Sequence, residues 1–309
     1  MSNTDVNNPL VSIIVVTYNS SLFVRETLES AKRQSYNNIE LIITDDASTD
    51  DTVKVCREWI ANNKNRFVRV ELKTVEQNTG IAKNCNRGLN MANGEWLKYI
   101  AGDDILMDDC IKDYLIFIDE NKDISFITSH IQTIDESGNS INAEEFDYDA
   151  LQKYFFSKSA QKQLKTYARL PIFLNSPAFF IRKEAINKAG GFDERFKIYE
   201  DICLIYRMNI NNYRIYNLEK TTVKYRIHEN AISRSTTEEI ESRRKTEQIL
   251  IFDIYRRKYL NKLNPIDLSV YYETWLNYKY KGFFGHKAKK VLMTFSLFYW
   301  YLKVLNRMP

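Results

Sequence analysis

Two pairs of adjacent aspartates directly follow apolar runs in this sequence. The run "IELIIT" leads into Asp45 and Asp46, and "WLKYIAG" leads into Asp103 and Asp104. Adjacent carboxylates repel one another, and a hard cation with oxygen ligands relieves that repulsion. Mg²⁺ or Mn²⁺ uses one or two protein carboxylates and takes its other ligands from water and phosphate oxygens. The pairs therefore indicate a site for a divalent cation and a phosphorylated ligand.

Each pair also has a structural alternative, because aspartates near the start of a helix cap its free N–H groups. In "DDASTDD" capping accounts for Asp50 and Asp51, which stand closer to the expected helix than Asp45 and Asp46 do. Asp104 can likewise cap the helix that follows it. The position of the pairs in the fold has to separate the two interpretations.

Apolar runs and amphipathic segments alternate over the first 120 residues. We expect strands at 11–19, 39–44, 68–73 and 96–101, followed by helices near 24–31, 53–60, 81–92 and 111–118. Continuous β-branched runs suit strands covered on both faces, as in a parallel sheet. Further along, "ISFITSH" and "SPAFFIR" are expected strands, "TTVKYRIHENAIS" is expected to be a last strand followed by a loop, and 150–164 is either a helix or a loop. The alternation predicts an open α/β sheet with helices on both faces.

Ligands of such sheets bind beyond the carboxyl ends of the strands. Thr17, Tyr18 and Asn19 end the first expected strand, and the two aspartate pairs end two others. We therefore expect an aromatic ring and four carboxylates to meet at one rim of the sheet. No glycine-rich phosphate loop follows the first strand, which argues against dinucleotide oxidoreductases and P-loop enzymes.

The composition is that of an ordinary globular protein of 309 residues with 44% hydrophobic residues. Its four cysteines stand far apart, without the spacing of a zinc site or a disulfide framework, so we expect reduced core residues. They are Cys56, Cys85, Cys110 and Cys203. The N-terminal "MSNTDVNNPL" has neither the basic start nor the apolar core of a secretory signal. The expected location is the cytoplasm.

The charge is distributed unevenly along the chain. From Arg243 onward there are 14 Lys/Arg and 4 Asp/Glu, a net charge of +10, against −6 for the preceding residues. The segment from Lys279 to Arg307 is basic and aromatic, which predicts an amphipathic helix on the anionic inner face of the plasma membrane. A helix docked on the catalytic domain or on a second subunit is the alternative. No recognised nucleic-acid-binding module accompanies these charges, so we expect no nucleic-acid partner.

Three segments, in this order and spacing, carry a family resemblance. "VSIIVVTYN" through "LIITDDASTDDT", then "NTGIAKNCNRGLNMANGEWLKYIAGDD", then "GGFDERFKIYEDICLIYRM" resemble glycosyltransferase family 2. The similarity covers about Pro9 to Ser235. It implies the GT-A fold, an open, mostly parallel twisted α/β sheet flanked by helices. It also implies a catalytic domain at 1–235, with a donor half at 9–104 and an acceptor half at 105–235, and a helical C-terminal extension at 236–309.

The resemblance also implies roles at the donor end of the site. Tyr18, between Thr17 and Asn19, would lie beside the base of a UDP-type donor, and Asp46 would accept a hydrogen bond from that base. Asn86 and Lys83 would approach the diphosphate, with Lys83 supplying the charge that many relatives carry as Arg at the position of Cys85. The family's acidic D-x-D motif falls on Ala101 to Asp104, so its first Asp is missing. Asp103 would contact the ribose or the metal, and Asp104 the metal.

By the same resemblance, Asp201 in "YEDICLIYR" is the catalytic base, and His228 in "YRIHENAIS" lies near the metal or the diphosphate. A metal-bound site with such a base transfers a sugar from a nucleotide diphosphate donor and inverts the anomeric carbon. Asn175–Pro177 and Phe192-Asp193 are expected to wall the acceptor side. Acidic residues are also common in the first turn of a helix, and a lone His is often a packing residue.

The sequence thus predicts an inverting, Mn²⁺- or Mg²⁺-dependent glycosyltransferase that uses a UDP-sugar and a saccharide or lipid-linked saccharide acceptor in surface polysaccharide or glycan synthesis. A nucleotidyltransferase is an alternative, although it would usually have a glycine-rich basic loop where this chain has "TYNSSLFVRE". A nucleotide-sugar-binding scaffold without catalysis is a second alternative, suggested by Ala101 and Cys85.

Overall fold

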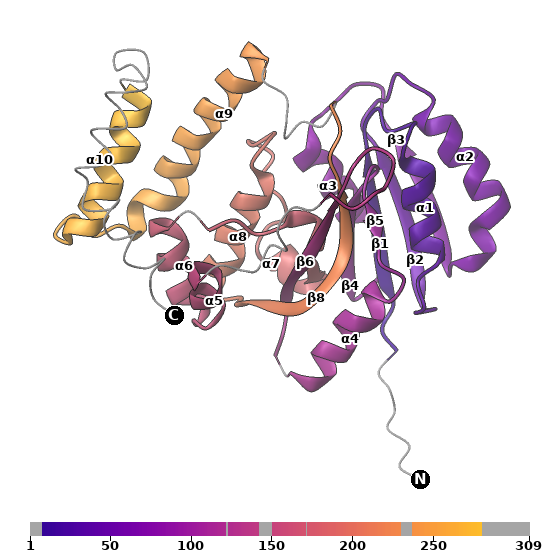
Figure 1. The fold of residues 1–309 in the computed structure, drawn as a ribbon, viewed down its shortest axis with the longest axis horizontal. Helices are drawn as coiled ribbons and strands as arrows, with labels where there is room; N and C mark the ends of the chain where they lie inside the picture. Colours follow the sequence, from indigo (N-terminus) through magenta and orange to yellow (C-terminus); the bar gives the residue numbers. More distant parts are fainter. Residues whose placement is uncertain (1–7, 122, 142–149, 171, 230–236, 280–309) are drawn as a thin grey trace, which may run out of the picture.

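The structure, a computed structural model, describes residues 8–121, 123–141, 150–170, 172–229 and 237–279. Eight strands form one sheet in the order β3-β2-β1-β4-β7-β6-β8-β5, with helices on both faces (Figure 1). The strands are β1 Val11–Thr17, β2 Ile39–Asp45, β3 Arg69–Thr74, β4 Trp96–Ala101, β5 Ile105–Leu106, β6 Phe126–Ile134, β7 Phe180–Arg182 and β8 Ile215–Arg226. The predicted α/β architecture is confirmed.

Helices of the first half connect its parallel strands. These are α1 Val24–Lys32, α2 Thr52–Asn63 with the 3-10 turn η1 Lys64–Arg66, α3 Ile81–Met91 and α4 Cys110–Glu120. Strands β3, β2, β1 and β4 are all parallel neighbours. Their carboxyl ends therefore lie at one edge, as the alternation of apolar and amphipathic segments predicts.

The second half joins the same sheet through antiparallel pairs of β7 with β4 and with β6. Its helices are α5 Ala150–Phe156, α6 Ala160–Arg169, α7 Lys183–Lys188 and α8 Glu200–Ile210, with the 3-10 turn η2 Ser176–Ala178. Residues 150–164, for which helix and loop were both open, are helical apart from the short connection between α5 and α6. Strand β8 pairs with β6 on one side and with the short β5 on the other, and β5 forms the edge of the sheet opposite β3.

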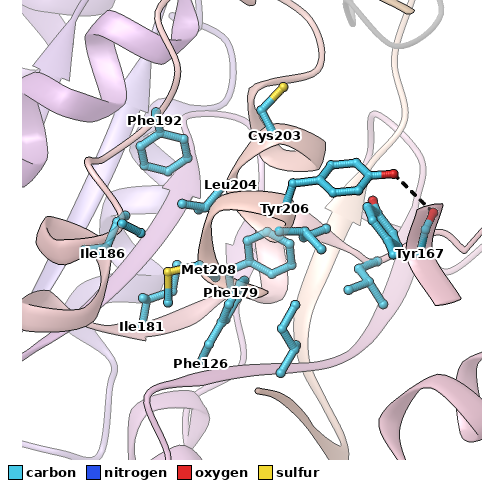
Figure 2. Close-up of a cluster of buried hydrophobic side chains, with 14 of the residues drawn as sticks. Phe126, Tyr167, Phe179, Ile181, Ile186, Phe192, Cys203, Leu204, Tyr206 and Met208 are labelled. Carbon is cyan, nitrogen blue, oxygen red and sulfur yellow. Dashed lines mark hydrogen bonds between the residues drawn. The ribbon is translucent and has the colours of Figure 1, made fainter. Parts of the chain in front are cut away.

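Each face of the sheet carries its own apolar core. Ile13 and Ile14 are both fully buried but belong to different clusters, because successive side chains of a strand point to opposite faces. One cluster packs α1, α2 and α4 on the sheet, and the other packs α3, α6 and α8 on the opposite face. Figure 2 shows the part of the second cluster that surrounds α8, including Leu204, Tyr206 and Met208. Each side chain buried in this way stabilises the fold by about 1.5–3 kcal/mol.

The C-terminal segment adds α9 Glu238–Ile251, a π-helical turn η3 Phe252–Arg256, a 3-10 turn η4 Arg257–Tyr259 and α10 Pro265–Lys279. Ile251, Phe252 and Tyr255 are buried in the same cluster as α8. In Figure 1, α9 and α10 lie at the end of the molecule opposite α1 and α2.

The predicted membrane-binding tail falls almost entirely on residues 280–309, outside the described residues, and stays a prediction. Within the described part of the chain, no helix combines the length and apolarity needed to cross a bilayer. All four cysteines lie in described regions, where they are buried and unbridged, as expected.

Candidate active site

The loop after β1 is tied to the loop after β2 by polar side chains. Thr17 Oγ1 donates to Asp45 Oδ2 at 2.8 Å, and Ser48 donates to the same carboxylate through N–H and Oγ. Asn19 Oδ1 accepts the Thr49 N–H at 2.8 Å. The backbone of Asn19 adopts a left-handed φ of 50°. Asp45 is therefore a structural residue that holds two strand ends together. Tyr18 stands between these contacts with its side chain exposed at the rim.

Asp46 is buried and connects the end of β2 to the start of α3. Its carboxylate accepts hydrogen bonds from Thr79 N–H (2.9 Å), Thr79 Oγ1 (2.6 Å) and Gly80 N–H (2.7 Å). Arg87 Nη2 donates to it as well, at 3.2 Å. A carboxylate has about four acceptor positions. Asp46 therefore shapes the turn in front of α3, and a nucleotide base would have to replace one of these four donors to bond with it.

The two predicted diphosphate residues on α3 differ in environment. Lys83 is exposed. Asn86 uses its amide on the "GGFDE" turn, donating to Phe192 O and Glu194 Oε1, both at 2.9 Å, and accepting from Phe192 N–H at 2.8 Å. The charged side chain of Lys83 therefore faces solvent, whereas the side chain of Asn86 links α3 to the turn before α8.

The second aspartate pair lies directly after β4, beside the end of β8. Asp104 Oδ1 accepts the Arg226 N–H at 2.9 Å, and Asp103 Oδ2 lies 2.9 Å from His228 Nε2. Asp104 Oδ2 is buried without a hydrogen-bond partner among the described residues. Burial raises the pKa of Asp104 well above its usual range, and the charge of Asp103 raises it further. The structure thus brings together the three predicted metal-site residues, Asp103, Asp104 and His228.

Arg226 holds this corner together, and its role was not predicted from the sequence. Its side chain is fully buried. The guanidinium donates to the carbonyls of Asp103 (2.9 Å) and Glu136 (2.7 Å) and to the carboxylate of Glu26 (2.6 Å). It also lies 4.8 Å from the ring centroid of Phe23. The sequence indicates this role only through the position of Arg226 two residues before the predicted metal-site residue His228. The partners of Arg226 lie up to 200 residues away along the chain.

We expect Arg226→Lys to lower the free energy of unfolding by about 3 kcal/mol, because an ammonium cannot reproduce the forked contacts and leaves buried carbonyls unpaired. Chemical denaturation of native and variant protein measures this difference. Arg25→Lys, on the exposed side of α1, is the matched control and should change stability by less than about 0.5 kcal/mol. Equal stability of Arg226→Lys and native protein would show that the buried contacts of this guanidinium are not needed.

Glu200 and Asp201 form the first turn of α8. Burial raises the pKa of both carboxyl groups, and the Asp201 charge raises that of Glu200 further. Asp201 is half-buried and accepts hydrogen bonds from the Ile202 N–H (2.7 Å) and from the Ser176 side chain. The raised pKa places the basicity of Asp201 above that of an ordinary aspartate, a property that suits proton abstraction.

Two buried residues indicate which of the acidic groups lie near them. Burial raises the pKa of the Cys85 thiol on α3, and the charges of Glu200, Asp201 and Asp46 raise it further. Lys98 on β4 is buried, its pKa is lowered by burial to about 8, and Asp104 is one of the charges that oppose this lowering. Lys98 Nζ also donates to Pro177 O, next to the Ser176 that binds Asp201. Asp46 and Asp201 therefore lie near Cys85, whereas Lys98, which points to the opposite face of the sheet, lies near Asp104.

The chemistry of the corner after β4 fits a divalent cation. A buried carboxylate oxygen without a partner is costly, and a cation would satisfy it. Among the described residues, no group of three or more His, Cys, Asp or Glu side chains is arranged to hold a metal by itself. A Mg²⁺ or Mn²⁺ ion held here would therefore have to take most of its ligands from water and diphosphate oxygens.

Comparison with known proteins now decides the family. The sequence profile of Glycosyl transferase family 2 matches residues 12–191, more than half of the chain. The chain belongs to glycosyl transferase family 2. Its matched region runs from β1 to the two glycines that begin the "GGFDE" turn and includes both aspartate pairs. This protein is thus a glycosyltransferase with the GT-A fold.

Individual relatives are distant but cover most of the chain. An uncharacterised glycosyltransferase of Methanocaldococcus jannaschii is 24% identical over 77% of this chain and 78% of its own. The glycosyltransferase GlyG of Streptococcus pneumoniae is 25% identical over 73% of each chain. Among solved structures, TarS of S. aureus in complex with UDP-GlcNAc superposes with a TM-score of 0.61 at 19% identity, covering 92% of this chain and 79% of that one. The mannosyltransferase PcManGT of Pyrobaculum calidifontis, in complex with GDP-Man and Mn²⁺, superposes with a TM-score of 0.56 at 16% identity, covering 96% and 84%.

Proposed function

We propose that this glycosyltransferase moves a sugar from a UDP-sugar to an acceptor hydroxyl with inversion of the anomeric carbon, and that Asp201 is the base. The observation that carries the proposal is that Asp46 after β2 and Asp201 on α8 both lie close enough to Cys85 for their charges to raise the pKa of its thiol. An acceptor hydroxyl and a donor diphosphate need to be held at one place, and a carboxylate of raised pKa lies beside it.

The reaction follows as a single displacement. The Asp201 carboxylate takes the proton of the acceptor hydroxyl while the hydroxyl oxygen bonds to the anomeric carbon. The bond between that carbon and the diphosphate oxygen breaks on the opposite face, and the diphosphate leaves with the electron pair. Ser176 and the Ile202 N–H hold Asp201 in place for this step. Pro177, next to Ser176, is fixed by Lys98, so the predicted acceptor wall is attached to the central strand of the site.

The diphosphate is assigned to the corner formed by Asp103, Asp104 and His228. A Mg²⁺ or Mn²⁺ bound there would act as a Lewis acid and stabilise negative charge on the leaving group. Asp104 would hold the ion through its unpartnered Oδ2, and Asp103, oriented by His228, would bind the ion or the ribose. The presence of Mn²⁺ with the donor in PcManGT supports this assignment. Lys83, exposed on α3, is the residue that we propose to supply a positive charge to the diphosphate.

We assign the uracil ring to a position against Tyr18. Asp46 and the Thr79–Gly80 turn would form the floor of its pocket. The UDP-GlcNAc bound to TarS supports a uridine nucleotide. The resemblance to family 2 supports a saccharide or lipid-linked saccharide acceptor, in the synthesis of surface polysaccharide or another glycan.

We expect UDP to bind more tightly than GDP or TDP in the presence of Mn²⁺, and Tyr18→Ala to weaken UDP binding about tenfold, since stacking of a base on an aromatic ring contributes about 1–3 kcal/mol. Isothermal titration calorimetry with the three nucleotides, repeated with a chelator, measures both effects. Tyr154→Ala removes an equally exposed tyrosine on α5 and serves as the control. Binding of GDP or TDP alone would overturn the assignment of the base.

A further inference from the structure

The segment that leads into α8 is held by a carboxylate of the C-terminal extension. Three successive backbone N–H groups, of Lys197, Ile198 and Tyr199, donate to the side chain of Glu247 on α9 at 2.8, 3.0 and 3.2 Å. Glu247 is only 3% exposed. A buried carboxylate is costly unless hydrogen bonds compensate for its lost hydration, and here the backbone supplies them.

Other residues of the extension hold the same segment. Tyr255, in the π-helical turn after α9, donates to Asp193 Oδ2 at 2.6 Å and stacks on Tyr206 of α8 with ring centroids 5.4 Å apart. Gln248, next to Glu247, donates to the Tyr199 hydroxyl at 3.0 Å. The extension therefore fixes both the segment 193–199 and the buried face of the helix that follows it.

This segment lies between the two sides of the proposed site. At its end, Asp201 follows the Glu247-bound amides by two residues. On its other side, the Lys197 side chain packs against Gly80, where an added Cβ would lie 3.4 Å from Lys197 Cγ. The Gly80 N–H bonds to Asp46, but Asp46 has three further donors of its own. The contacts of Asp46 thus do not depend on Glu247, whereas the backbone N–H groups just before α8 donate to it directly.

We infer that Glu247 is a positioning residue: it holds Lys197–Tyr199 so that Asp201 is aimed at the acceptor hydroxyl, and the C-terminal extension is thereby part of the active site. The inference rests on the proposed role of Asp201 as base. It differs from a purely structural role of Glu247, namely attachment of α9 to the domain, because it predicts an effect on the chemical step without an effect on donor binding.

Steady-state kinetics and UDP binding of Glu247→Gln test this difference. Gln keeps the shape of the side chain but has one acceptor oxygen and presents an NH₂ group to N–H donors. We expect kcat to fall about 10- to 100-fold, because misplacement by about 1 Å costs up to 10²-fold, while the Kd of UDP stays within about threefold. Glu239→Gln, at an exposed position of the same helix, is the control and should leave both unchanged. A native kcat in Glu247→Gln, or a loss of UDP affinity as large as the loss of kcat, would overturn the inference.

The double variant Asp201→Asn/Glu247→Gln shows whether Glu247 acts through Asp201. If it does, adding Glu247→Gln to Asp201→Asn should lower the residual activity by less than about twofold, since the group that Glu247 positions is already gone. Additive losses would place the action of Glu247 elsewhere and refute the inference.

Hydrogen–deuterium exchange of the native protein and Glu247→Gln gives a readout that does not depend on activity. We expect the amides of residues 197–199 to exchange at least about tenfold faster in the variant, with the amides of β1 and β4 unchanged. If native protein transfers no sugar, or Asp201→Asn is as active as native protein, the proposed function fails. Exchange then still decides the structural part, because equal rates at 197–199 would show that Glu247 does not hold the segment.

Discussion

An Asp201→Asn variant is expected to transfer sugar about a thousandfold more slowly than the native enzyme while binding UDP with unchanged affinity. Asn has the shape of Asp, and its Oδ1 still accepts the Ile202 N–H, but it cannot take a proton. General base catalysis contributes about 10²- to 10⁴-fold, so the loss should fall in this range. Initial rates with a UDP-sugar and a saccharide acceptor, together with calorimetric UDP titration, measure the two quantities.

The pH dependence of kcat gives an independent signature of the same residue. Because Asp201 works as a base, activity rises as this carboxyl group loses its proton. Burial raises its pKa, so the acid limb of the profile should lie at higher pH than the ordinary aspartate pKa of 3.8. Burial and the charge of Asp201 raise the pKa of Glu200 well above its usual range, so Glu200 is still protonated while Asp201 loses its proton. The limb should therefore change little in Glu200→Gln and be lost in Asp201→Asn.

Exposed Asp253, in the π-helical turn, provides the matched control: Asp253→Asn should retain native kcat and a native pH profile. Equal turnover by native enzyme and Asp201→Asn would end the assignment of the base. Absence of turnover in native protein that still binds UDP would instead favour a nucleotide-sugar-binding scaffold over an enzyme.

Much of the fold was predictable because the strands of the donor half are buried on both faces. Ile13 and Ile14 pack into opposite cores, so the run from Ile13 to Val16 is continuously apolar and indicates a central parallel strand. The segment "SPAFFIR" was predicted as one strand, but only Phe180–Arg182 pairs in the sheet. Pro177 has no N–H to donate to a ladder, and the residues around it form a 3-10 turn instead.

Strand β8 was predicted only in its last part. Its first half alternates weakly, with Ile215 and Leu218 buried and the following residues Glu219, Lys220 and Thr221 exposed. The pairing with β6 is irregular between Ser129 and Ile131, which disturbs the period of two on which sequence patterns depend. Its start was therefore hidden in the pattern, although its end at Arg226 was visible.

The candidate site likewise has residues that the sequence predicts and residues that it does not. Topology predicts residues at the carboxyl ends of strands, so Tyr18, Asp46 and Asp104 follow from the sequence. Residues that support them from elsewhere do not. Buried charged residues such as Arg226 and Glu247 are rare, and their partners lie 50 to 200 residues away along the chain. A single sequence contains no signal for such pairings, whereas the structure shows them directly.

Replacement of Asp104 by Asn is expected to remove the effect of Mn²⁺ on both stability and activity. The variant keeps the contact with the Arg226 N–H through Oδ1, so the fold should be preserved, but the buried Oδ2 becomes an NH₂ group that repels a cation. In native protein with UDP, Mn²⁺ at 100 times its Kd should stabilise the folded state by about 2.7 kcal/mol. A 100-fold weaker Kd in Asp104→Asn would reduce this to about 0.4 kcal/mol. Transfer should fall by at least about 100-fold, since a Lewis acid contributes several kcal/mol to stabilising the leaving group.

Thermal unfolding with and without Mn²⁺ checks the stability effect, and initial rates across a Mn²⁺ titration check the activity. Asp108→Asn, four residues further along and largely exposed, should behave as native protein in both. Asp103→Asn separates the two aspartates of the pair: if Asp103 contacts the ribose instead of the ion, that variant should weaken UDP binding and keep the Mn²⁺-dependent stabilisation. Retention of the full Mn²⁺ effect by Asp104→Asn would mean that its buried oxygen does not face the cation. The position of Asp104 next to Asp103 would then need another explanation, such as contacts within the protein of the kind that hold Asp45, which accepts hydrogen bonds from Thr17 and Ser48.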